Sequence, residues 1–284
     1  MLAKPRSVVK PVLFVLVALA AFSPGATAAT PCPDGTTRCV TKTIKDMQAR
    51  YDVLAPACDH SVIYSLSYLL TTQQYKTVTK DPAFFQDTPW VNREDWNFAK
   101  LYLNAMDAYR PHRTTAGVPA AWQIALDAAH DQSVTGSGDL LLGINAHVNR
   151  DLPFALYQMG LVAPNGTSRH ADHEKVNVML RQVLPKILQY ESKRFDPTIP
   201  GDVVMGTDID LDGLMSLLVA WREDAWDNAM LLATAPNDVV RNTVAATIET
   251  QAATEATALK TATLATPAQK AARNAWCAAH WNAT

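Results

Sequence analysis

The fold of this chain is decided by one stretch, Asp139-Leu-Leu-Leu-Gly-Ile-Asn-Ala-His147-Val-Asn-Arg-Asp151-Leu-Pro-Phe-Ala-Leu-Tyr-Gln158. Wound as a helix, it is apolar nearly all round, and such a helix is normally buried among others. The rest of the chain reads as helical runs joined by short polar turns, without the apolar–polar alternation of a strand. The sequence therefore predicts an all-α fold, a single multi-helix bundle with a buried central helix.

Polar side chains interrupt this apolar helix at its middle. His147 and Asp151 are four residues apart, so they share one helical face. Buried polar groups are costly unless they are paired or used. One interpretation is a catalytic or ligand site, with His147 as base or metal ligand and Asp151 as ligand or orienting partner. The other is a hydrogen-bonded clasp that fixes how the helices dock.

A divalent metal such as zinc is a candidate cofactor, because His and Asp are among its ordinary ligands. The proposed metal ligands are His147 and Asp151, although the chain has no His-Glu-x-x-His signature. The helix that follows carries His170, His173 and Asn177. If this helix packs antiparallel to the central helix, His170 and His173 lie closer to Gln158, at the end of the central helix, than to His147. Asn177 is then better placed to share a site with His147.

Arg222 is the third candidate catalytic residue, after His147 and Asp151. It has no carboxylate three or four residues away on its own helix, so it can reach a core carboxylate such as Asp151. Alternatively it lies over Trp226 or is solvated. The candidate ligand-binding residues are Tyr102, Asn145, Asn149, Asp172 and Asn177.

The first 29 residues have the pattern of a signal peptide. A basic start that includes Lys4, Arg6 and Lys10 precedes a short apolar run and a small-residue stretch that ends at Ala29. The apolar run has about 12 residues, against the ~20 that a spanning helix needs, which favours cleavage over anchoring. We therefore expect a secreted or periplasmic protein with no stable membrane span after cleavage.

The four cysteines are Cys32, Cys39, Cys58 and Cys277. An even number in an exported protein suggests disulfides, with three pairings open. We favour Cys32 with Cys39, across a turn-rich loop, and Cys58 with Cys277. A thiolate site is the weaker alternative, since no Cys-x-x-Cys occurs.

We expect an N-terminal loop over 30–42, a helical core domain over 43–233, and a C-terminal helical tail over 234–284 packed on the core. Pro185 should kink or divide the helix that contains it. Asp208-Ile-Asp-Leu-Asp212-Gly213 is similar to the start of a calcium loop, but its twelfth position is Val219. An acidic helix start is the better interpretation. The expected helices cover 43–55, 60–79, 93–109, 120–131, 139–158, 169–195 and 210–233.

The chain has a formal net charge of −2, which gives no reason to expect nucleic acid or anionic lipid as a partner. It lacks the serine-hydrolase elbow, the phosphate loop and the dinucleotide fingerprint. Two functions remain open, a hydrolase that is metal-assisted or acts by general acid–base catalysis, and a non-catalytic protein that binds a small apolar ligand. A structural motif with no site is the third alternative.

The central segment Gly143-Ile-Asn-Ala-His-Val-Asn-Arg-Asp-Leu152 resembles the Gly-[Ile/Met]-Asn-Ala-His-Ile-Asn-x-Asp-Leu core of an uncharacterised bacterial domain-of-unknown-function family. The resemblance covers roughly Lys45 to Ala233. It implies an all-helical domain and no particular reaction. Where that family usually has an aromatic residue after its Asp, this chain has His173, so His173 is a weaker candidate than Asp172 or Asn177. Looser matches are Phe98-Ala-x-x-Tyr102, the Trp122 segment, Asp172-x-x-x-Val-Asn177 and Trp221-Arg-x-x-Ala-Trp226.

Overall fold

The computed structural model describes residue 32 and residues 34–110, 116–199, 203–204 and 209–283. The signal peptide expected over 1–29 lies outside these residues, as does Asp208 of the acidic segment. Within the described chain the helices are α1 Thr37–Leu54, α2 Val62–Val78, α3 Thr88–Tyr109, α4 Ala120–Asp131, α5 Gly136–Asn145, the π-helix η1 Ala146–Asp151, α6 Leu152–Met159, α7 His170–Arg194, α8 Leu211–Thr234, α9 Asp238–Ala262 and α10 Pro267–His280.

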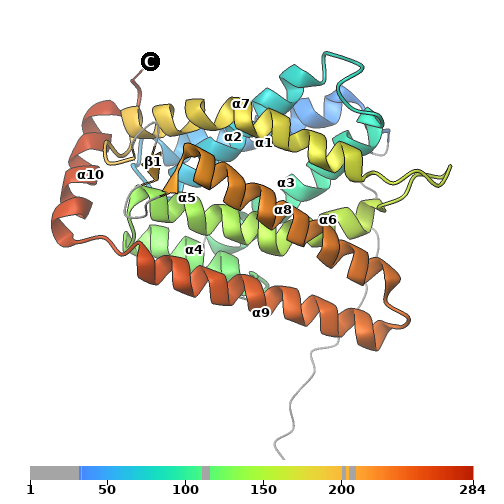
Figure 1. Ribbon diagram of the computed structural model, residues 1–284. Coiled ribbons are helices and arrows are strands. Elements are labelled where there is room, and N and C mark those ends of the chain that lie inside the picture. Colours follow the sequence, from blue (N-terminus) through green and yellow to red (C-terminus); the bar gives the residue numbers. More distant parts are fainter. Residues whose placement is uncertain (1–31, 33, 111–115, 200–202, 205–208, 284) are drawn as a thin grey trace, which may run out of the picture. The chain divides into compact units, whose positions relative to one another are not determined.

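The bundle is organised around the continuous segment α5–η1–α6, drawn in green in Figure 1. All ten residues of α5 are buried. This segment packs against α2, α4 and α9 through α5, and against α3 and α8 through η1 and α6. The all-α prediction with a buried central helix is confirmed. The described chain also contains one antiparallel pair of two-residue strands, β1 Val203–Val204 and β2 Ile209–Asp210.

The close approach of α2 to the central helix depends on a glycine. A Cβ at Gly143 would lie 2.3 Å from the ring of Tyr64 on α2. A side chain at this position would therefore push the two helices apart. Aromatic and aliphatic side chains fill the space around this contact, and Trp122, Tyr102, Leu142 and Leu152 are at most 1% exposed.

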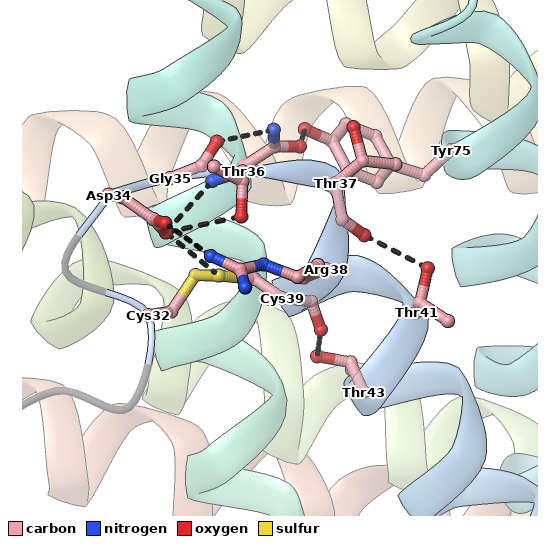
Figure 2. Close-up of a disulfide and its surroundings, with 11 residues drawn as sticks. Cys32, Asp34, Gly35, Thr36, Thr37, Arg38, Cys39, Thr41, Thr43 and Tyr75 are labelled. Carbon is pink, nitrogen blue, oxygen red and sulfur yellow. Dashed lines mark hydrogen bonds and ion pairs between the residues drawn. A yellow bond between two sulfur atoms is a disulfide. The ribbon is translucent and has the colours of Figure 1, made fainter.

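The N-terminal loop expected over 30–42 is too long, because α1 already begins at Thr37. The carboxylate of Asp34 accepts hydrogen bonds from the backbone N–H and hydroxyl of Thr36 and pairs with Arg38, as Figure 2 shows. These contacts hold the chain at the entrance to the helix. The Cys32–Cys39 disulfide then joins the loop to the first turns of α1.

Contacts of Asp87 and Pro89 explain why α3 begins at Thr88 and not at Arg93 as expected. The side chain of Asp87 accepts a hydrogen bond from the Trp90 N–H, and Pro89 occupies the first turn, where its missing N–H is not needed. Asn92 on α3 donates to the Gly35 carbonyl and accepts from the Tyr75 hydroxyl, which ties the loop before α1 to α2 and α3.

Three other features of the helices differ from the expectations. The glycine-rich residues before Asp139 form the first turn of α5, with the Thr135 side chain accepting from the Gly138 N–H. Helix α7 continues through Pro185 without dividing. The segment after residue 233 contains two helices, and α9 packs against α4, α5, η1 and α8. Through these contacts α9 forms one wall of the core.

Both expected disulfides, Cys32–Cys39 and Cys58–Cys277, are present. The second joins the segment before α2 to α10. No helix among the described residues is both long enough and apolar enough to cross a lipid bilayer.

Candidate functional site

The centre of the site is a π-helical turn. Residues Ala146–Asp151 adopt a π-helix, in which the Leu152 N–H bonds to the His147 carbonyl five residues earlier. Pro153 follows at once and has no N–H to give to the Asn149 carbonyl. Single π turns within α-helices occur frequently at functional sites. Here the wide turn carries both His147 and Asp151.

His147 and Asp151 form a hydrogen-bonded dyad. His147 Nδ1 lies 3.0 Å from Asp151 Oδ2, and the two side chains are 2% and 0% exposed. Trp122 Nε1 donates to the same oxygen at 2.8 Å, and Arg150 Nη1 donates to Oδ1 at 2.8 Å. Arg150 is held in turn by Glu249 on α9. Asp151 therefore has a partner at each oxygen and is fixed in position.

This geometry sets the protonation of His147. A carboxylate can only accept, so Nδ1 carries the proton and Nε2 has a free lone pair. Burial lowers the pKa of His147, and the hydrogen bond and charge of Asp151 offset part of this effect. Nε2 is buried and has no hydrogen-bond partner. A neutral imidazole with an oriented ring and an unused Nε2 is suited to accept a proton.

Aromatic rings hold the imidazole on several sides. The Phe98 ring stacks on it with centroids 3.5 Å apart and an interplanar angle of 8°. Tyr68 approaches at 4.5 Å and 62°, and the rings of Tyr64, Trp122 and Tyr102 lie 6.0 to 6.1 Å away. The ring is therefore confined to one orientation.

His147 lines a pocket of about 110 Å³ whose other lining residues come from α2, α3, α5, η1, α7 and α8. An engineered apolar cavity of about 150 Å³ holds benzene, so this space fits a group of a few heavy atoms. One wall is aliphatic and includes Ile144, Val176, Met179, Leu180, Val183 and Leu218. Apolar walls with a few convergent polar groups are typical of small-molecule sites.

Two acidic side chains that were not among the predicted site residues, Glu94 and Asp95 on α3, line the same pocket. Burial raises the pKa of Glu94 to about 7, although the charge of Arg222 opposes the shift. Burial and the charge of Glu94 raise the pKa of Asp95 well above its usual range, and its Oδ2 is buried without a partner. The sequence did hold a signal, because both residues share an apolar helical face with Val91 and Phe98.

Arg222 also lines the pocket, but it does not reach Asp151 through any described contact. Its Nε donates to Asn177 Oδ1 at 2.7 Å, and its Nη2 donates to the His173 carbonyl at 2.7 Å. Asp151 is paired with its sequence neighbour Arg150 instead. Arg222 is 5% exposed, so it places a buried guanidinium at the pocket wall.

The other predicted ligand-binding residues have mainly structural contacts. Asn145 donates to the Ala252 carbonyl of α9 and accepts from Asn149. Asp172 accepts from the backbone N–H groups of Gln86 and Asp87, so it holds the loop before α3. None of the five predicted ligand-binding residues lines the pocket described above. Tyr102, which is one of them, packs with its hydroxyl against Met106. Asn177 affects the pocket only indirectly, because its side chain accepts a hydrogen bond from Arg222, which lines the pocket.

The dyad is poorly suited to bind a metal by itself. Zinc normally takes three or four protein ligands, whereas both Asp151 oxygens are already hydrogen-bonded. Among the described residues, His147 and Asp151 belong to no group of three potential ligand side chains close enough to share an ion. The arrangement is therefore better suited to proton transfer than to coordination.

A family model described as "Family of unknown function (DUF5995)" matches residues 40–262. The chain belongs to this family, which is consistent with the resemblance seen in the sequence. No curated protein and no solved structure matches the chain.

Proposed function

We propose that this DUF5995 protein is an exported hydrolase that acts on a small, mainly apolar substrate by general acid–base catalysis. The observation that carries the proposal is the unpartnered Nε2 of His147, which lines a pocket together with two acidic groups of raised pKa. Titratable groups perturbed by burial within one pocket are typical of active sites.

In this proposal His147 Nε2 takes a proton from water while the water oxygen forms a bond to the substrate carbonyl carbon. Asp151 holds the Nδ1 proton and stabilises the imidazolium that results. Glu94 in its acid form gives a proton to the leaving oxygen or nitrogen as that bond breaks. Its pKa of about 7 suits this role, because a catalytic acid works best near the ambient pH.

The pocket also indicates the substrate class. Its volume of about 110 Å³ and its aliphatic wall fit a short acyl or small aromatic group. The buried guanidinium of Arg222 is a donor for an anionic or carbonyl oxygen at the wall. Short-chain esters and amides with one polar end combine these features.

The test is a panel of nitrophenyl esters and anilides with acyl chains of increasing length. We expect turnover of the shortest members and a decline as the acyl chain outgrows the pocket. His147→Gln should lower kcat/KM by about 10²- to 10⁴-fold, the usual contribution of a positioned acid or base. Circular dichroism and thermal melting confirm that the variant is folded.

His130→Gln is the matched control, because His130 is exposed at the end of α4, away from the pocket lining. It should leave turnover unchanged. Equal activity of folded His147→Gln and the unchanged protein would contradict the role of the dyad.

The second candidate function is non-catalytic binding of a small apolar molecule, and the aliphatic wall of the same pocket favours it. Native mass spectrometry and calorimetry with small aromatic and short-chain ligands test it. Binding that survives His147→Gln, with no hydrolysis of any panel member, would favour this candidate over the hydrolase.

Export is supported by the basic and apolar start of the sequence and by the two disulfides, which persist in oxidising compartments. N-terminal sequencing of protein recovered outside the cytoplasm should find a start near Thr30. Full-length protein retained inside the cell with four free thiols would contradict export.

A further inference from the structure

Three potential metal ligands meet on the face where α7 packs against α8. His170 and Glu174 are four residues apart on α7, and Glu223 lies opposite them on α8. One ligand atom from each residue lies within 4.8 Å of the other two. His170 Nε2 is 3.0 Å from Glu223 Oε2, and the two carboxyl groups are within hydrogen-bonding reach of each other. Two carboxylates this close repel each other unless a proton or a cation lies between them.

The ligands are already oriented by their neighbours. The His170 ring stacks on His173 with centroids 6.0 Å apart and meets the edge of Trp226 at 4.9 Å. Asn177 donates to Glu174 Oε1 at 2.9 Å. Such supporting contacts are characteristic of metal sites, where they fix ring and carboxylate orientation.

Among the described residues, one carboxylate oxygen of this cluster lacks a hydrogen-bond donor. Glu223 Oε1 is buried and lacks a hydrogen-bond partner. The neighbouring Arg222 guanidinium donates to Asn177 and to His173 rather than to this carboxylate. The side chains of His170 and Glu223 are 39% and 40% exposed, so an ion can reach them and water can complete its coordination.

We propose that His170, Glu174 and Glu223 form a binding site for a divalent transition-metal ion of the zinc class. One imidazole and two carboxylates match the charge and ligand preferences of zinc. Bonds of about 2.0–2.2 Å place tetrahedral ligand atoms about 3.4 Å apart, and the ligand atoms here lie within 4.8 Å of one another. The ion replaces the His170–Glu223 contact and cross-links α7 to α8 beside Arg222.

This site is separate from the acid–base dyad and does not depend on the proposed hydrolysis. The purified protein is stripped with chelator, equilibrated with zinc, and analysed by elemental mass spectrometry and titration calorimetry. We expect about one zinc ion per chain and an increase in Tm, since an ion that binds the folded state stabilises it. Cobalt substitution should give the intense visible bands of a four-coordinate site.

Glu174→Gln and Glu223→Gln keep the side-chain shape, and each should weaken zinc binding at least about 10-fold, the lower limit for loss of a supporting group. His170→Ala should abolish the increase in Tm. His130→Ala, which removes an exposed histidine elsewhere, should bind zinc as the unchanged protein does. Zinc binding that is unaffected in all three ligand variants, or no retained zinc in the unchanged protein, would overturn the proposal.

Discussion

The central segment carries two buried charged networks of very different design. The first, the dyad network, comprises His147, Asp151, Trp122, Arg150 and Glu249. Within it both oxygens of the buried aspartate have donors. One buried side-chain nitrogen, His147 Nε2, lacks a partner, and His147 faces a pocket of about 110 Å³.

The second, the Arg273 network, lies at the start of α5. It comprises Asp139, Arg273, Asp196, His60 and Glu191, all at most 5% exposed. Arg273 Nη1 donates to Asp139 Oδ2 at 2.6 Å and its Nε lies 3.7 Å from Asp196. Several atoms here lack partners, including both oxygens of Glu191 and Nη2 of Arg273.

The difference lies in the space beside the unpartnered atoms. His60 Nδ1 and Asp139 Oδ1 also lack partners, and the cavity that these two residues line is about 20 Å³, which is enough for one water molecule. An unpartnered group beside room for a ligand points to function, whereas the same group in a closed core points to a cost in stability. The dyad network should therefore control activity, and the Arg273 network should control stability.

Among the variants that test this difference, Asp151→Asn should have the largest effect, a loss of activity. The neutral amide carries no charge to stabilise the imidazolium that forms when Nε2 takes a proton, so kcat/KM should fall by about 10²- to 10⁴-fold. Asp139→Asn, a matched change on the same buried segment, should leave the activity of the folded fraction unchanged. Steady-state kinetics on folded protein checks both, and equal losses in the two variants would remove the functional distinction.

Arg273→Met tests the other side of the comparison. It leaves Asp139 and Asp196 buried without their cation, which typically costs about 3–5 kcal/mol. Arg181→Met is the control, since its side chain is 61% exposed and that of its partner Asp212 is 84% exposed, so its loss should be smaller. Urea unfolding measures both. A larger loss for Arg181→Met would contradict the assignment of stability to the Arg273 network.

The sequence was sufficient for the bundle and for the dyad because both depend on local spacing. Apolar periodicity located α4 with the observed bounds, and a spacing of four residues placed His147 beside Asp151. The start of α1 was missed because it depends on the side-chain contacts of Asp34 and on a disulfide. Those contacts have no periodic signature.

The other polar residues of the pocket could not be predicted from the spacing of residues along the sequence. Glu94 and His147 come together only when α3 packs on the central segment, and their order in the chain does not reveal this. The sequence allowed Arg222 to reach a core carboxylate such as Asp151, to lie over Trp226 or to be solvated. The packing of α7 on α8 instead brings it to Asn177 and His173. Raised pKa values likewise follow from burial, which is a property of the assembled helices.

The pH profile of activity sharpens the assignment of the acid. Glu94 must be protonated to act, and its pKa is about 7, so kcat/KM should fall about tenfold per pH unit above that value. His147 must be neutral, and burial lowers its pKa from the ordinary value of histidine, so the acid limb lies on the acid side of that ordinary value. Glu94→Gln should lower activity and remove the alkaline limb. A profile with an unchanged alkaline limb in Glu94→Gln would assign that limb to another group.

The smallest effect should come from His60→Gln in the Arg273 network. Burial and the charge of Arg273 lower the pKa of His60 to about 4, so it is neutral at pH 7 and its replacement should cost about 1 kcal/mol or less. The unfolded chain binds the His60 proton near pH 6.5 and the folded chain near pH 4, so His60 reduces stability as pH falls through this window. His60→Gln removes that contribution, and the free energy of unfolding should decline less between pH 6.5 and 4 than in the unchanged protein. Urea unfolding at several pH values measures the two slopes, with His130→Gln as the exposed control. Identical slopes for His60→Gln and the unchanged protein would mean that His60 titrates alike in both states, and that burial in this network carries no cost in stability at that residue.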